Sequence, residues 1–169
     1  MIRKPQPTEY NSFYQPYIDQ IDSADMVAAL KAQSETLSKF FLEHSDKAEY
    51  KYAADKWSIK EILNHMNDTE RVFAYRAMCI VRGEKQELPG FDQNSYQDHS
   101  HSNLRTLESL VKEFEAIRLS SILFFENIPE SESLSVGIAS GFSVSVRALA
   151  AMIVGHADHH IQVIRNKYL

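Results

Sequence analysis

Apolar residues recur along this chain at the three- and four-residue spacing that places them on one face of a helix. Each of the four segments with this spacing has about twenty residues or more, and together they cover most of the chain. They are residues 23–44, 58–82, 102–127 and 143–167. Four helices of this length predict an all-α protein with a four-helix bundle.

Polar residues at the ends of these segments predict where the helices begin and stop. Ser58, with Glu61 three positions later, forms a capping-box pattern before the second helix, and Gly83 is a stop signal after it. The other expected N-caps are Asp22 or Ser23, Ser102 or Asn103, and Ser143 or Ser145.

The segments between the helices predict the organisation of the chain. We expect one domain over residues 1–169, with an ordered arm over 1–21 and a bundle over 22–168. The arm is expected to pack four aromatic residues on the bundle: Tyr10, Phe13, Tyr14 and Tyr17. Residues 84–101 form a connection long enough to cross over the bundle, and 130–142 suggest a loop or a short hairpin.

Composition narrows the class of protein. The chain has 169 residues, 44% of them hydrophobic, and a formal net charge of −5. Without a basic stripe or an apolar run of bilayer length, neither nucleic acid nor a membrane is an expected partner. The single cysteine, Cys79, excludes an internal disulfide. We therefore expect a cytoplasmic protein.

The main candidate for chemistry is a group of three histidines near the C-terminus. His156 and His160 are one helical turn apart, in the middle of the apolar face of the fourth helix, while His159 lies near its boundary. Two imidazoles in this register can bind one divalent metal ion. A single inward histidine is more often a core residue that hydrogen-bonds to a backbone carbonyl.

A third ligand can come from the second helix, where His65 occupies the inward stripe. His65, His156 and His160 would hold Zn²⁺, Ni²⁺ or a similar ion and leave at least one coordination position open, as in catalytic sites. Imidazole suits several divalent ions, so the pattern does not choose among zinc, nickel, iron and manganese.

Several stretches of the chain resemble the DinB-like superfamily, over residues 23–168. The resemblance rests on Trp57–His65 (WSIKEILNH), Thr69–Arg71, Arg76–Ala77, Arg82–Gly83, Leu88–Gln93 (LPGFDQ) and Gly155–Ile164 (GHADHHIQVI). It implies a four-helix bundle in up-down-down-up order. It also implies a divalent metal ion, commonly zinc or nickel, held by His65, His156 and His160, with His159 a neighbour rather than a ligand.

Three functions are compatible with such a site. Some proteins of the family that the chain resembles join low-molecular-weight thiols to small electrophiles, and our first hypothesis is a metal-dependent thiol transferase. The second is a metal-dependent hydrolase, which ranks lower because no carboxylate falls clearly on the inward stripes and Glu70 and Asp158 point away from them. The third is a stress-related protein whose metal ion or ligand mainly stabilises the bundle.

Other polar residues are weaker candidates. Arg76 could pair with a substrate carboxylate or form a salt bridge at the end of the bundle. Asn94 and Tyr96 could line the mouth of the site. Four further residues are expected to serve other roles: Trp57 as a helix anchor, Cys79 as a small core residue, and His99 and His101 in solvent or as supplementary metal contacts.

The apolar residues of the first and third helices cover wide arcs. Phe124 and Phe125 are adjacent, so they cannot both face one core by simple helix geometry. A second buried surface, and with it a homodimer, is therefore expected.

Overall fold

The computed structural model describes all 169 residues. The bundle consists of α2 (Met26–Glu43), α3 (Ile59–Val81), α5 (Leu107–Glu126) and α6 (Val146–Lys167). The smaller elements are α1 (Gln15–Asp19), α4 (Gln93–His99) and a hairpin of β1 (Val136–Ala139) and β2 (Phe142–Ser145). The prediction of an all-α four-helix bundle is confirmed, with the hairpin as its only sheet.

The capping signals explain most of the helix ends. Ser58 and Glu61 form the predicted capping box, in which the Ser58 N–H donates to the Glu61 carboxylate at 2.6 Å. Ser145 caps α6 by accepting a hydrogen bond from the Ala148 N–H at 3.0 Å. Gly83 follows α3 with a φ of 90°, which is the left-handed conformation that glycine adopts at helix ends.

Two predicted N-caps are wrong. The cap of α2 is Asp25, whose carboxylate accepts from the Val27 N–H at 3.0 Å, while the Ser23 hydroxyl bonds the backbone of Asp25 itself. The cap of α5 is Thr106, because residues 102–104 form a separate 3₁₀ turn that ends in extended backbone at Arg105.

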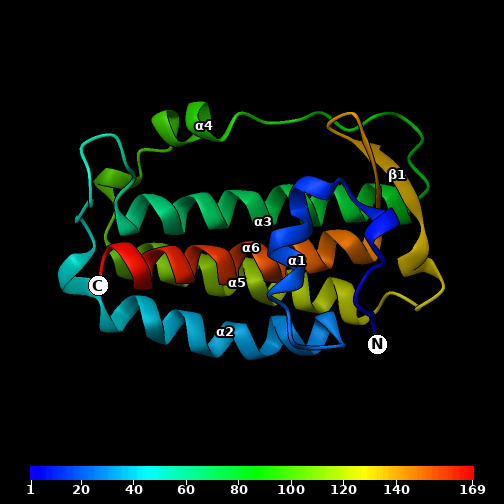
Figure 1. Ribbon diagram of the computed structural model, residues 1–169, viewed down its shortest axis with the longest axis horizontal. Coiled ribbons are helices and arrows are strands. Elements are labelled where there is room, and N and C mark those ends of the chain that lie inside the picture. The colour runs from blue at the N-terminus through cyan, green and yellow to red at the C-terminus, as the bar shows by residue number, and fades with distance from the viewer.

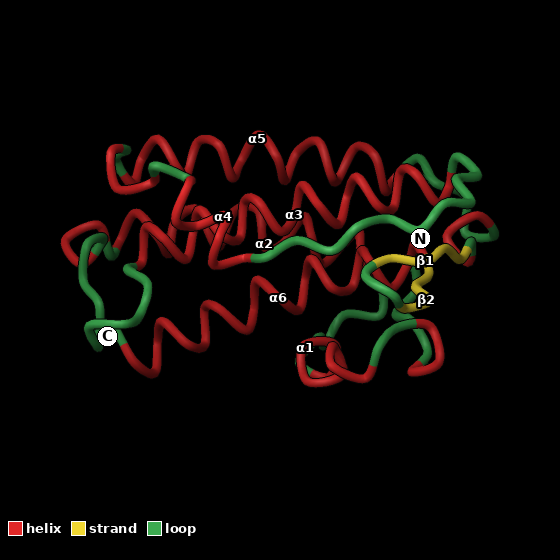
Figure 2. The backbone as a smooth tube through the Cα atoms, turned by 90° about the horizontal axis from the view of Figure 1, so that it is seen from above, coloured by secondary structure: helices red, strands yellow, loops and turns green.

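The four helices run in up-down-down-up order (Figure 1). α2 and α6 point one way, and α3 and α5 point the other way. α3 packs against α5 and α6, and α2 packs against the same two helices, so α2 and α3 occupy opposite corners. Because α3 and α5 are parallel, the connection between them returns along the length of the bundle and carries α4 (Figure 2).

A buried polar layer crosses the middle of the bundle. The Arg118 guanidinium of α5 donates to both carboxylate oxygens of Glu70 on α3, at 2.9 to 3.0 Å, and to the Gln33 side-chain oxygen of α2. The Gln33 amide donates in turn to the Val154 carbonyl and the Asp158 carboxylate of α6. This network therefore joins all four helices.

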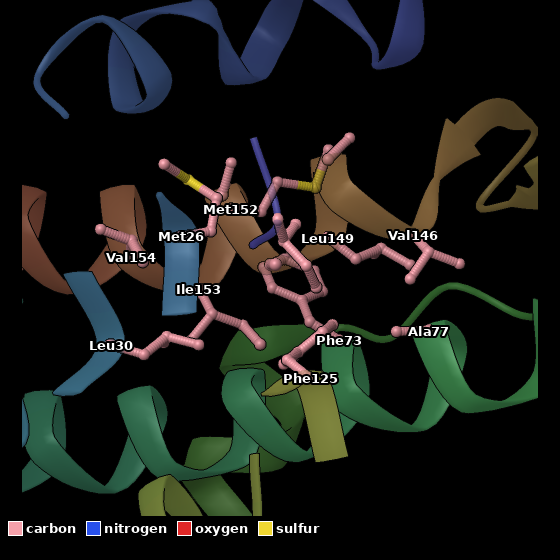
Figure 3. Packing of buried hydrophobic residues seen from close by; sticks show 14 of the residues in the cluster. Met26, Leu30, Phe73, Ala77, Phe125, Val146, Leu149, Met152, Ile153 and Val154 are labelled. Atoms are coloured by element: carbon pink, nitrogen blue, oxygen red, sulfur yellow. The ribbon is translucent and has the colours of Figure 1, made fainter. Parts of the chain in front are cut away.

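The polar layer separates two apolar clusters. The cluster toward the hairpin is shown in Figure 3, where Phe73, Phe125, Leu149 and Ile153 converge between α3, α5 and α6. The other cluster lies toward the C-terminus and includes Phe41, Leu63, Phe114 and Ile164.

Phe124 and Phe125 both pack against the same apolar cluster, although helix geometry indicated that they could not both face one core. Phe125 is fully buried in this cluster, and Phe124 is half-buried against it. The exposed apolar residues of α5 are instead Leu119 and Leu123. The homodimer stays a prediction.

None of the helices combines the length and apolar character needed to cross a bilayer.

The N-terminal arm and the hairpin cover one side of the bundle. α1 packs on α6, with Ile18 almost fully buried. Of the four aromatic residues expected to pack, Tyr10 is buried, Tyr14 and Tyr17 are half-buried, and Phe13 is exposed. The hairpin turns through Ser140 and Gly141, both with positive φ, as in a type I′ turn.

Candidate metal centre

Three histidines from two helices meet beside the middle of the bundle. The Nε2 atom of His156 lies 3.0 Å from Nε2 of His65 and 3.0 Å from Nε2 of His160. One ring nitrogen from each residue lies within 4.8 Å of the other two. The structure thus brings together the three residues that the sequence singled out, and each presents the same type of nitrogen to a common point.

The packing of α3 against α6 produces this convergence. His156 and His160 are four residues apart on α6, which places one ring a turn above the other. His65 lies in the first half of α3, which runs antiparallel to α6 and packs closely against it. The site therefore depends on helix register rather than on a flexible loop.

Burial keeps these imidazoles neutral. Loss of solvent lowers the pKa of His65 to about 4. Burial, followed by the proximity of the other histidines, places the pKa of His156 and of His160 well below the usual range. A neutral imidazole has a lone pair available for a metal ion, so the donor set and its protonation state at neutral pH fit a divalent cation.

Aromatic and hydroxyl groups surround the three rings. The Trp57 ring lies 4.9 Å from the His65 ring, and the Thr69 hydroxyl lies 3.5 Å from His65 Nδ1. Tyr17 of α1 packs edge-on against His159 at 4.8 Å. The Thr69 hydroxyl can accept a hydrogen bond from Nδ1–H of His65, and in that tautomer Nε2 is free as an acceptor.

Gly155 allows the arm to approach this site. A Cβ atom at position 155 would lie 2.3 Å from the Tyr17 carbonyl oxygen and 2.7 Å from its carbon. No side chain fits between α1 and α6 at this point. The glycine beside His156 therefore brings Tyr17 over the histidine cluster.

The cluster forms part of the wall of a cavity of about 420 Å³. Its lining comes from α3, α6, the arm, the crossover connection and the hairpin turn. Aromatic rings and imidazoles make up most of the wall, Arg76 is its only charged side chain, and it contains no Asp or Glu. The lining residues are Phe13, Tyr14, Tyr17, Trp57, His65, Thr69, Phe73, Arg76, Gly90, Phe91, Gln93, Ser140, His156, His159 and His160.

The weaker candidates from the sequence have different positions. Arg76 lines the cavity, whereas Asn94 lines an adjoining hollow together with Trp57, His159 and His160. Tyr96 is half-exposed and packs against Phe91 at 5.2 Å.

The remaining candidates lie outside the cavity. His99 and His101 are exposed and do not line it, and Cys79 is half-buried against the apolar cluster toward the hairpin. Glu70 lies off the metal-facing stripe, as expected, but it is buried in the ion pair with Arg118, and Asp158 is hydrogen-bonded to Gln33.

Sequence reasoning missed the contribution of the arm and the crossover to the cavity wall. Tyr14 and Tyr17 were expected to pack on the bundle, but helix patterns gave no sign that they would face the histidines. Gly155, inside a helix and next to His156, was the available signal, because a helical glycine often marks a close backbone approach.

The chain resembles known proteins in sequence and in fold. A similar curated protein is "Putative metal-dependent hydrolase OB0413" of Oceanobacillus iheyensis, 24% identical over 116 residues that cover 68% of this chain and 66% of that protein. The chain thus spans slightly less than two thirds of that relative.

A solved structure shares the fold. YfiT from Bacillus subtilis, described as a probable metal-dependent hydrolase with an unusual four-helix bundle topology, matches with a TM-score of 0.72. The match covers 98% of this chain and 93% of that one at 11% identity. The family model of the DinB superfamily matches residues 29–164, which is most of the chain, and the protein therefore belongs to the DinB superfamily.

Proposed function

We propose that His65, His156 and His160 bind a divalent metal ion, Zn²⁺ or Ni²⁺, and that the protein uses it to hydrolyse a small molecule. The observation that carries the proposal is the convergence of three neutral imidazoles on the wall of one cavity, where Nε2 of His156 lies 3.0 Å from Nε2 of each of the other two. An ion held by three imidazoles retains an open position and lowers the pKa of a water or thiol bound there. The names of the two similar proteins favour water.

The residues around the histidines have supporting roles in this proposal. Thr69 orients His65 through its Nδ1 atom. Trp57 and Tyr17 pack against His65 and His159 and exclude bulk water from one side of the cluster. His159 lines the cavity beside the three, and burial lowers its pKa, so it is the neutral group available to accept a proton.

A second candidate is transfer of a low-molecular-weight thiol to a small electrophile. The observation in its favour is the absence of Asp and Glu from the cavity wall. Metal hydrolases commonly use a carboxylate as general base, as the helical His-Glu-x-x-His zinc proteases do. A thiol whose pKa is lowered by a metal ion is already a thiolate near neutral pH and needs no such base.

The metal proposal is tested by elemental analysis of protein purified without an affinity tag. The wild-type chain should carry about one divalent ion, and His65→Ala and His156→Ala should lose it. His99→Ala is the matched control, because His99 is exposed and outside the cavity. Equal metal content in the wild type and the two site variants would refute the assignment.

The reaction is tested next on the metal-loaded protein. One panel offers small esters, amides and lactones with water alone, and another offers thiols with electrophiles. Turnover in the first panel that is lost in His65→Ala supports hydrolysis, and turnover only in the second supports thiol transfer. Metal binding that raises the melting temperature with no turnover in either panel points to a purely stabilising ion.

A further inference from the structure

Arg76 is buried in α3 without a counter-ion. The residue is 5% exposed, and no carboxylate lies within ion-pair distance of its guanidinium. A charged side chain is rarely buried unless it is paired, because loss of hydration is costly. Burial lowers the pKa of Arg76, and the group with the next largest influence is the Tyr14 hydroxyl rather than an acid.

The protein provides hydrogen-bond acceptors for only one of the three nitrogen atoms of this guanidinium. Its Nη2 atom donates to the Pro89 carbonyl at 2.6 Å and to the Ser140 hydroxyl at 2.9 Å. These two bonds use both hydrogens of Nη2. The two N–H groups of Nη1 and the one of Nε have no acceptor in the protein, so three donors of a buried cation are available to a ligand.

Arg76 stands where two cavities adjoin. The cavity that contains the histidines and a second one of about 330 Å³ share Phe13, Tyr14, Arg76 and Ser140 as wall residues. The second cavity is mostly apolar, with Phe142, Val144, Leu149 and Met152 among its lining. Neither wall contains an acidic residue, so both favour an anion with an apolar portion.

The same stripe of α3 carries the histidine and the arginine. His65, Thr69, Phe73 and Arg76 all line the histidine cavity at spacings of three or four residues. Eleven positions at a rise of ~1.5 Å place the Cα atoms of His65 and Arg76 about 16 Å apart along the helix. A single small ion cannot contact both groups, whereas an extended small molecule can.

We propose that Arg76 binds an anionic group, such as a carboxylate, at the end of the substrate distant from the histidine cluster. The substrate class is then a small extended molecule with an anionic end, an apolar portion beside the second cavity and a reactive group at the histidines. This inference rests on the proposed metal function, whose substrate it specifies. The Ser140 hydroxyl and the Pro89 carbonyl position the guanidinium.

The test uses Co²⁺-loaded protein and thiol ligands, whose binding to the cobalt ion is followed by thiolate-to-cobalt absorption. Each ω-mercaptocarboxylate, from mercaptoacetate to 6-mercaptohexanoate, is compared with the mercaptoalcohol of equal length. In the wild type, the carboxylate should bind about tenfold more tightly than the alcohol in the longer pairs. The preference should be smaller for mercaptoacetate, which is too short to reach Arg76.

Substitutions test whether Arg76 causes the preference for the carboxylate over the alcohol. Arg76→Gln should abolish it, while Arg82→Gln, which removes an exposed charge near the end of the same helix, should leave it intact. Arg76→Lys retains the charge and should keep part of the preference, and melting curves identify variants that do not fold. A carboxylate preference that is absent in the wild type, survives in Arg76→Gln or is greatest for mercaptoacetate would overturn the inference.

Failure of the metal proposal can be distinguished from failure of this one. If elemental analysis finds no cobalt in the protein, the metal function is wrong, and hexanoate and hexanol are titrated into the metal-free protein by calorimetry. Hexanoate binding that is about tenfold tighter than hexanol binding and depends on Arg76 still supports the anion site. Equal binding of the two, or equal binding by wild type and Arg76→Gln, refutes it.

Discussion

Tyr17 lies so close to Gly155 that a methyl group at position 155 would fall 2.3 Å from the Tyr17 carbonyl oxygen. We predict that Gly155→Ala displaces α1 and lowers stability, although alanine is the better helix former. Overpacking against backbone costs about 1–3 kcal/mol, whereas the gain in helix propensity is at most ~1 kcal/mol. Urea denaturation measures the net effect.

Hydrogen exchange locates the cause of the Gly155→Ala effect. Amides of the arm over residues 13–21 should exchange faster in the variant, while amides in the middle of α5, which does not pack against α1, should not change. Unchanged exchange in the arm would contradict the role of Gly155 as the contact point for α1.

The bundle and the histidine cluster were predictable for different reasons. Four long segments with helical spacing and good caps define four helices locally, as Ser58 with Glu61 illustrates. The meeting of His65 with His156 and His160 requires α3 to lie beside α6, which helix spacing alone does not specify. The expectation that α3 lies beside α6 came from the inward position of all three rings together with the family resemblance.

The polar layer and the cavity wall could not be predicted in the same way. Glu70 lies off the metal-facing stripe, as the sequence predicts, but helix geometry did not show that it would face Arg118 from a third helix. Arg118 gave no local signal, since its burial depends on partners 48 and 85 residues away. The same holds for Tyr14 and Tyr17, whose positions follow from how the arm folds back.

The buried pair of Arg118 and Glu70 should be sensitive to loss of one partner. We predict that Glu70→Leu lowers the free energy of unfolding by about 3–5 kcal/mol, because it leaves the Arg118 guanidinium buried without a counter-charge. The double variant Glu70→Leu/Arg118→Met should be more stable than Glu70→Leu alone. Chemical denaturation of the three proteins measures these differences.

A matched surface pair serves as the control for this prediction. Arg71 pairs with Glu113 between the same two helices but is half-exposed, so Arg71→Met should cost no more than about 1 kcal/mol. A loss in Glu70→Leu as small as that in Arg71→Met would show that the buried pair is not a structural requirement of the bundle.

Thr69 should affect metal affinity without being a ligand. Its hydroxyl lies 3.5 Å from His65 Nδ1, so Thr69→Val removes the group that orients the ring and keeps the side-chain shape. We predict a fall in affinity of about 10- to 100-fold, measured by competition with a chelator of known affinity. Thr36→Val, at an exposed hydroxyl on α2 away from the cavity, is the control. Equal affinity in both variants would contradict this role.

The metal-free protein should lose stability as the pH falls. Burial lowers the pKa of His65 from its ordinary value of 6.5 to about 4. Burial also lowers the pKa values of His156 and His160 well below 6.5. Below pH ~6.5 the unfolded chain therefore binds protons that the folded chain does not, so the free energy of unfolding decreases as the pH approaches 4. Denaturation midpoints in the presence of a chelator, at pH 7.5, 6 and 5, should follow this order. In the triple variant His65→Ala/His156→Ala/His160→Ala this part of the slope should disappear, and an unchanged slope would place its origin elsewhere in the protein.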